Sequence, residues 1–118
     1  MIRGGLVTLF VRDVGRAVRF YVETLGMKLV EQAGDGWAVI DAGEGFRIGL
    51  HQSAARGDVE GRGAFAPSVG LYPKVPLEEA IAIYENRGVK FETKDDGPVT
   101  LAHFRDPDDN VLYLCQER

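Results

Sequence analysis

The stretch at residues 104–114 reads FRDPDDNVLYL and places a cluster of turn-forming residues between two apolar runs. Asp and Asn hydrogen-bond to their own backbone and tolerate left-handed backbone angles, so residues 106–110 predict a tight turn. The residues that follow, Val111 to Leu114, form a short apolar run of the kind that is typical of a buried strand. This interpretation places a tight turn, followed by a buried strand, in the last part of the sequence.

Outward from this stretch, the first half of the chain predicts a strand, a helix and three more strands. The first strand covers residues 6–11, Asp13 is a suitable N-cap for the helix, and Gly26 stands where a helix ends. Three β-rich stretches follow at residues 27–33, 36–42 and 46–52. The helix itself is predicted from apolar residues at helical spacing, which are Val14, Ala17, Val18, Tyr21 and Leu25.

The second half repeats this order. Residues 67–75 predict a strand, Pro76 opens a helix at a position that tolerates its missing N–H, and Gly88 ends that helix. The buried face of the helix is predicted to hold Leu77, Ala80, Ile81 and Tyr84. Strands are expected at residues 89–93, 99–105 and 110–116.

The two halves align at an offset of 62 residues, which brings Gly26 onto Gly88 and Leu9 onto Leu71. A matching order of elements, a matching helix end and a matching following strand indicate two copies of one unit. We therefore predict a single domain, residues 1–118, built from units at about 1–52 and 67–118, with a connector at 53–66.

Composition limits the function. The chain has 118 residues, a net charge of −4 and 45% hydrophobic residues, which fits one folded domain and argues against nucleic acid or an anionic membrane as the main partner. The apolar run at residues 6–11 is too short for a membrane span or a signal-peptide core. The single cysteine, Cys115, excludes an internal disulfide, and a cytoplasmic location fits best.

At this point the chain resembles a known family. The stretch VRDVGRAVRFYVETLGMKLV, at residues 11–30, looks like the first helix and flanking strands of the glyoxalase/bleomycin resistance/extradiol dioxygenase superfamily, the vicinal oxygen chelate fold. FRDPDDNVLYL looks like its last turn, in which Asp109 stands where the family usually has Gly. The resemblance implies an α+β fold. Two βαβββ units would form curved mixed sheets around a cleft, with one helix on the convex side of each.

The resemblance also implies a divalent-metal site, and this sequence departs from it. The positions that usually supply His and Glu ligands fall on Leu6, Gly49, Ser68 and Tyr113. Leu and Gly have no donor side chain, and Ser and Tyr are poor ligands at neutral pH. We therefore predict no metal and no other cofactor. The alternative is a displaced metal site, for which His51, His103 and Asp41 are the candidates, supporting a glyoxalase-like lyase or isomerase or a dioxygenase.

Without charged ligands, the cleft is predicted to be apolar and aromatic, and to bind a small, partly aromatic organic molecule such as an antibiotic. Metal-free relatives include resistance proteins that sequester an antibiotic without changing it, so the prediction leans away from an enzyme. The resemblance further implies a homodimer. From strand alternation, the predicted ligand-binding residues are Leu6, Phe10, Trp37, Arg47, Gly49, His51, Ser68, Tyr72 and Tyr113.

Overall fold

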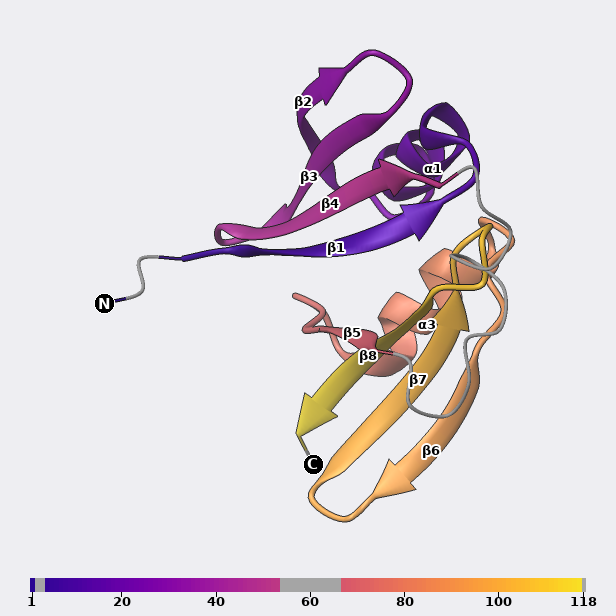
Figure 1. Cartoon of the computed structure of the whole chain (residues 1–118). Helices are drawn as coiled ribbons and strands as arrows, with labels where there is room; N and C mark the ends of the chain where they lie inside the picture. The colour runs from indigo at the N-terminus through magenta and orange to yellow at the C-terminus, as the bar shows by residue number, and fades with distance from the viewer. Residues whose placement is uncertain (2–3, 54–66, 118) are drawn as a thin grey trace. The chain divides into compact units, whose positions relative to one another are not determined.

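The computed structural model describes Met1, residues 4–53 and residues 67–117. The chain divides into two compact units, Met1–Ala64 and Phe65–Arg118 (Figure 1). The arrangement of the two units as one domain, 1–52 and 67–118, stays a prediction. Its connector, residues 53–66, lies outside the described residues except for Ser53. In the described part of the chain, no helix is long and apolar enough to cross a membrane.

The first unit contains a four-stranded mixed sheet with the order β1-β4-β3-β2. β4 pairs with β3 and β3 pairs with β2 in antiparallel fashion, whereas β1 runs parallel to β4. Parallel pairing needs a crossover connection, and the helix between β1 and β2 begins it. The strands are β1 (Leu6–Val11), β2 (Lys28–Ala33), β3 (Trp37–Gly43) and β4 (Phe46–Gln52).

The helix of the first unit begins and ends as predicted, but its second half is π-helical. In α1 (Val14–Arg19), the Asp13 side chain accepts a hydrogen bond from the backbone N–H of Arg16 at 3.0 Å, which confirms the N-cap. The helix then widens into a π-helical turn, η1 (Phe20–Thr24), in which the N–H of Leu25 donates to the carbonyl of Phe20. Apolar spacing does not distinguish this turn from an α-helix. Gly26, at φ +80°, ends it as expected.

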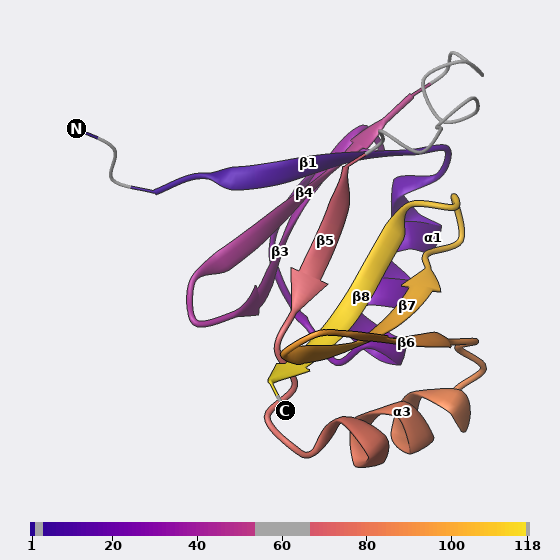
Figure 2. The same cartoon turned by 90° about the horizontal axis from the view of Figure 1, so that it is seen from below.

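The second unit repeats the architecture, with the sheet order β5-β8-β7-β6 and a parallel pair of β5 and β8 (Figure 2). Its helix, α3 (Leu77–Glu85), packs against β8, where the Gln116 side chain accepts a hydrogen bond from the N–H of Leu77 at 2.7 Å. Two βαβββ units in the described residues confirm the predicted fold class. The strands are β5 (Ser68–Leu71), β6 (Glu92–Asp96), β7 (Val99–Arg105) and β8 (Val111–Glu117).

Three predicted boundaries in the second unit were wrong. β5 was predicted to reach residue 75 but ends at Leu71, because Pro73 has no N–H to give to a ladder. Pro76, predicted as the first helical residue, is instead the N-cap of α3, which starts one residue later at Leu77. β6 was predicted at 89–93 and lies at Glu92–Asp96. The apolar residues that prompted that prediction pack in the core instead: Val89 is buried, and Phe91 meets Phe104 edge-on at 5.3 Å.

Strand alternation divides each sheet into a helix-facing side and an opposite side. In the first unit α1 packs against β3 and β4, and Ile48 and Leu50 are fully buried. In the second unit Leu112 and Leu114 are buried in the same way. The other buried strand residues on the helix-facing sides are Leu9, Val11, Ala38, Ile40, Val69, Ala102 and Phe104.

The turn at residues 106–110 is held by one buried carboxylate. Asp106 Oδ1 accepts hydrogen bonds from the backbone N–H groups of Asp108 and Asn110 at 2.8 and 2.9 Å, and its Oδ2 accepts one from the Asn110 side chain at 2.9 Å. Asp109 adopts φ +65°, the left-handed conformation expected where the family usually has Gly. The turn therefore uses its acidic residues for backbone geometry.

Replacing Asp106 by Ala removes the acceptor for three donors in a buried turn. We expect Asp106→Ala to lower the free energy of unfolding by roughly 1–3 kcal/mol, measured by urea denaturation. Asp35→Ala, in an exposed turn of the first unit, is the control and should stay within about 0.5 kcal/mol of the native protein. Equal stability of the two variants would contradict this account of the turn.

Candidate functional site

Strand register brings six predicted ligand-binding residues onto one face of the first sheet. Residues directly opposite each other on neighbouring strands point to the same side, so each set of paired residues forms a row across that face. From β1 to β2, the three rows are Leu6, Arg47, Asp41 and Lys28; then Thr8, Gly49, Val39 and Glu31; then Phe10, His51, Trp37 and Ala33. We call this surface the unit 1 face.

The unit 1 face is the side of the sheet turned away from α1. Ile48 and Leu50 alternate with Arg47 and His51 along β4, and the first two are buried against the helix whereas the other two are exposed. Two apolar side chains of β1 are also well exposed here, Leu6 at 45% and Phe10 at 39%. Large apolar side chains left accessible beside polar ones are the usual lining of an organic ligand site.

Trp37 lies across Gly49. A Cβ atom built on Gly49 would meet the Trp37 ring at its Cη2 atom, would lie 3.0 Å from Cζ3, and would lie 3.2 Å from Leu6 Cδ1. The indole therefore occupies the space that a side chain at position 49 would fill. This explains why Gly49 is buried although it belongs to the exposed side of the strand. An isolated glycine within a strand marks such a close approach.

His51 completes an aromatic cluster with Trp37 and Phe10. Its ring centroid lies 5.6 Å from that of Phe10 and 6.1 Å from that of Trp37, and both contacts are edge-on. His51 Nδ1 lies 2.8 Å from the carbonyl oxygen of Gln52. Because a carbonyl oxygen only accepts, the neutral imidazole carries its proton on Nδ1 and keeps a lone pair on Nε2. His51 is thus oriented to accept a hydrogen bond.

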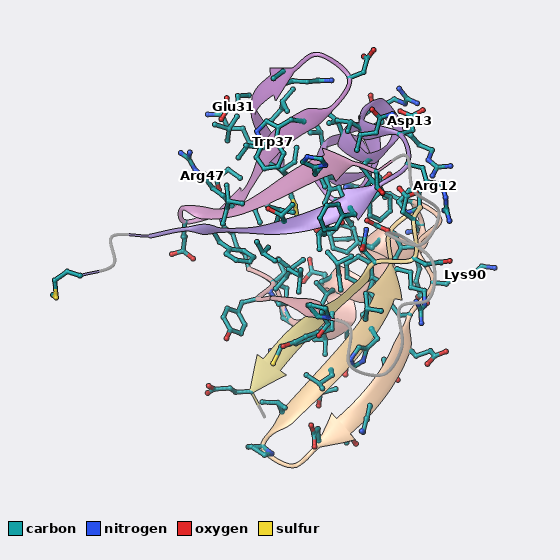
Figure 3. The ribbon with its side chains drawn as sticks, viewed as in Figure 1. Arg12, Asp13, Glu31, Trp37, Arg47 and Lys90 are labelled. Carbon is teal, nitrogen blue, oxygen red and sulfur yellow. The ribbon has the colours of Figure 1, made fainter. Side chains whose placement is uncertain are left out.

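The charged residues of the unit 1 face lie beside this cluster. Figure 3 shows the side chains of Glu31, Trp37 and Arg47 gathered over β2 to β4. Asp41 lies directly opposite Arg47, but its Oδ1 accepts a 2.7 Å hydrogen bond from the backbone N–H of Gly43 in its own turn. Arg47 is exposed and makes no hydrogen bond or ion pair with any residue that the structure describes.

The second unit gathers a smaller group of predicted residues. Ser68 pairs with Val111, and the next row across that sheet holds Gly70, Tyr113, His103 and Glu92. A Cβ on Gly70 would fall 2.6 Å from both Cζ and Oη of Tyr113, so the phenol lies across Gly70 as the indole lies across Gly49. Tyr113 also meets the His103 ring at 5.3 Å. Tyr72 follows the end of β5 and is 85% exposed.

Gly70 was not among the predicted site residues. The signal was available in the sequence, because an interior glycine between Val69 and Leu71 interrupts an apolar strand without a turn signal. The sequence alone does not show which side chain of a neighbouring strand lies against Gly70. Only the register of β5 and β8 identifies Tyr113 as the side chain that needs the space.

The four positions at which the family usually has metal ligands lie two in each unit, in neighbouring rows of its sheet. Leu6 and Gly49 are neighbours in the first unit, and Ser68 and Tyr113 are one row apart in the second. Of the displaced set, His51 and Asp41 lie two rows apart on the unit 1 face. His103 belongs to the other unit. Among the residues with a described placement, no three His, Cys, Asp or Glu side chains are grouped to hold a metal ion.

A family model matches residues 5–114, nearly the whole chain, and its description is Glyoxalase/Bleomycin resistance protein/Dioxygenase superfamily. The protein belongs to this superfamily. The match confirms the family that the resemblance indicated, and the two βαβββ units are the architecture which that resemblance implied.

Solved structures with this fold differ in their functions. TnmS3, an antibiotic binding protein from Streptomyces sp. CB03234, is similar at 25% identity and a TM-score of 0.73, with 100% of this chain and 99% of that chain covered. A lactoylglutathione lyase from Agrobacterium tumefaciens is similar at 16% identity and a TM-score of 0.74, covering 98% and 95%. A glyoxalase/bleomycin resistance protein/dioxygenase from Alicyclobacillus acidocaldarius has a TM-score of 0.76 at 18% identity, covering 98% and 91%.

The contact between Trp37 and Gly49 is testable by substitution. Gly49→Ala places a methyl group against the indole, so we expect the ring to move and the free energy of unfolding to fall by about 1–3 kcal/mol. Near-ultraviolet circular dichroism and tryptophan fluorescence should both change, since Trp37 is the one tryptophan. Gly5→Ala, where a Cβ has no neighbour within 4 Å, is the control. Unchanged spectra for Gly49→Ala would contradict the described packing.

Proposed function

We propose that this protein binds a small, partly aromatic organic molecule, such as an antibiotic, and sequesters it without changing it. The observation that carries the proposal is the cluster of Trp37, His51 and Phe10 on the unit 1 face, with the indole seated on Gly49. The ring edge at Cη2 and Cζ3 lies in the space above Gly49, and the half-buried indole keeps part of its surface accessible. Such a side chain offers a flat apolar surface to a planar ligand.

The polar groups of the face suit a binding role. Pockets for organic molecules combine an apolar lining with a few polar groups that orient the ligand. Here the polar groups are the Nε2 atom of His51 and the guanidinium of Arg47, both on β4 and both on the same side as Trp37. They flank the aromatic surface, so a ligand stacked on the indole has a hydrogen-bonding group in reach at either end.

The comparison with TnmS3 supports this proposal. The likeness extends over the whole of both chains at 25% identity, and that protein is an antibiotic binding protein. The likeness to the lactoylglutathione lyase, at 16% identity, concerns the fold alone. Because one fold hosts many functions, the argument for binding rests on the unit 1 face and the comparison is its support.

The proposal includes the absence of a metal. Leu6 and Gly49 stand at two usual ligand positions and have no donor atoms in their side chains, and the indole covers one of them. The Trp37 ring and the Leu6 side chain beside Gly49 offer no lone pair to a cation, which supports a metal-free unit 1 face. The predicted homodimer and the predicted cytoplasmic location stay predictions.

Ligand binding on the unit 1 face should be visible through Trp37. We expect a panel of planar aromatic antibiotics to include compounds that quench Trp37 fluorescence with saturation, because stacking on the indole changes its surroundings. Calorimetry with Trp37→Ala should then show affinity lowered by roughly 0.5–1.5 kcal/mol or more.

The control for this experiment is Phe46→Ala, which removes an exposed aromatic ring from the neighbouring strand β4 but lies outside the three rows of the unit 1 face. Its affinity for each compound should equal that of the native protein. No binding across the panel, or an equal loss in both variants, would contradict the proposed function.

Metal analysis tests the proposed absence of a bound metal ion. We expect purified protein to contain no stoichiometric Ni, Zn, Fe or Mn, and ligand affinity to be unchanged after dialysis against a chelator. Stoichiometric metal that is lost in His51→Ala would instead establish the displaced-metal alternative. Asp35→Ala, at an exposed turn, controls for adventitious binding to surface carboxylates.

A further inference from the structure

We propose that Arg47 makes the unit 1 face selective for aromatic ligands that carry an anionic group, such as a carboxylate, sulfonate or phosphate. This inference rests on the proposed function and deepens it, because it names the chemical class of the ligand and the residue that selects it. It follows from where Arg47 lies, from how its neighbours are engaged and from the contrasting group at the other end of β4.

Arg47 lies at the edge of the aromatic surface. On β4 it is two residues from Gly49, so its side chain leaves the same side of the strand as the position that Trp37 covers. Its neighbour on β1 is Leu6, whose Cδ1 atom is close to the same position. A guanidinium beside apolar side chains is less well screened by water than one on a polar surface, which strengthens its attraction for an anion.

The nearest carboxylate does not neutralise Arg47. Asp41 is its cross-strand neighbour, yet no ion pair joins the two among the described residues, and Asp41 Oδ1 is held by the N–H of Gly43. Asp41 also lies directly opposite Lys28, so this row contains two cations and one carboxylate. Glu31 is on β2, two strands from β4, so the two backbones are about 10 Å apart, and no ion pair joins Glu31 to Arg47 among the described residues.

His51, at the other end of β4, determines the orientation of the ligand. His51 is four residues from Arg47, or about 13 Å along the strand, on the same side. The tautomer that fits the contact of Nδ1 with the Gln52 carbonyl presents the lone pair of Nε2, and a lone pair repels an anionic oxygen. A planar ligand over Trp37 therefore places its anionic group toward Arg47, and a hydroxyl or amine group toward His51.

Arginine suits this role better than lysine would. Its guanidinium presents N–H donors in a planar fork that matches the two oxygens of a carboxylate or phosphate, and it stays charged at all relevant pH values. Hydrogen bonds to charged groups contribute more than neutral ones. Selectivity for the anion should consequently exceed what a single positive charge at that position provides.

The test uses two probes with the same ring, 2-naphthoate and 2-naphthalenemethanol, titrated by calorimetry into the full chain. We expect the native protein to bind the carboxylate about tenfold or more tightly than the alcohol. In Arg47→Ala this preference should disappear while the affinity for the alcohol is kept, and Arg47→Lys should retain part of it. Raising the salt concentration should weaken binding of the carboxylate only.

The matched control is Lys94→Ala, which removes one positive charge from an exposed position on β6, outside the unit 1 face, and should keep the preference. Equal affinity for the two probes in the native protein, or a preference that survives in Arg47→Ala, would overturn the inference and leave the proposed function standing. If neither probe binds, the proposed function and this inference fail together. Unfolding curves of the variants verify that each one is folded.

Discussion

The parallel pairing of the first and last strands of each unit is the constraint on which the rest of the structure depends. β1 with β4 and β5 with β8 bring together residues about forty positions apart in the sequence. Once these pairs form, the period-2 alternation of every strand is shared across the sheet, and one side of each sheet is assigned to the helix. A slip of one residue would move Ile48 and Leu50 out of the core and Arg47 and His51 into it.

The same register produces a feature that both units share, an aromatic ring lying across a strand glycine. Trp37 covers Gly49 and Tyr113 covers Gly70, although the two pairs use different strands of their units. In both pairs the ring occupies the space that a side chain on the glycine would fill. This is a physical reason for glycine at positions where most strand residues would supply a side chain of their own.

The residues that hold the backbone in place are largely different from those on which the proposed function rests. The buried turn around Asp106 and the cap at Asp13 use acidic side chains to hold the backbone, and any member of the superfamily can share them without sharing an activity. The face residues carry the functional argument. On the unit 1 face, Leu6 and Gly49 stand where the resemblance would place metal ligands, and their lack of donor side chains supports our proposal of stacking and a few directed hydrogen bonds.

The sequence by itself determined the features that depend on neighbouring residues. The limits of β1, β4 and β7, the cap at Asp13, the helix end at Gly26 and the turn at residues 106–110 follow from local alternation, capping and turn chemistry. The tertiary structure decided what depends on distant partners. The seating of Trp37 on Gly49, the contact of Tyr113 with Gly70 and the late start of β6 depend on cross-strand register and core packing, which bring together residues whose separation in the sequence carries no local signal.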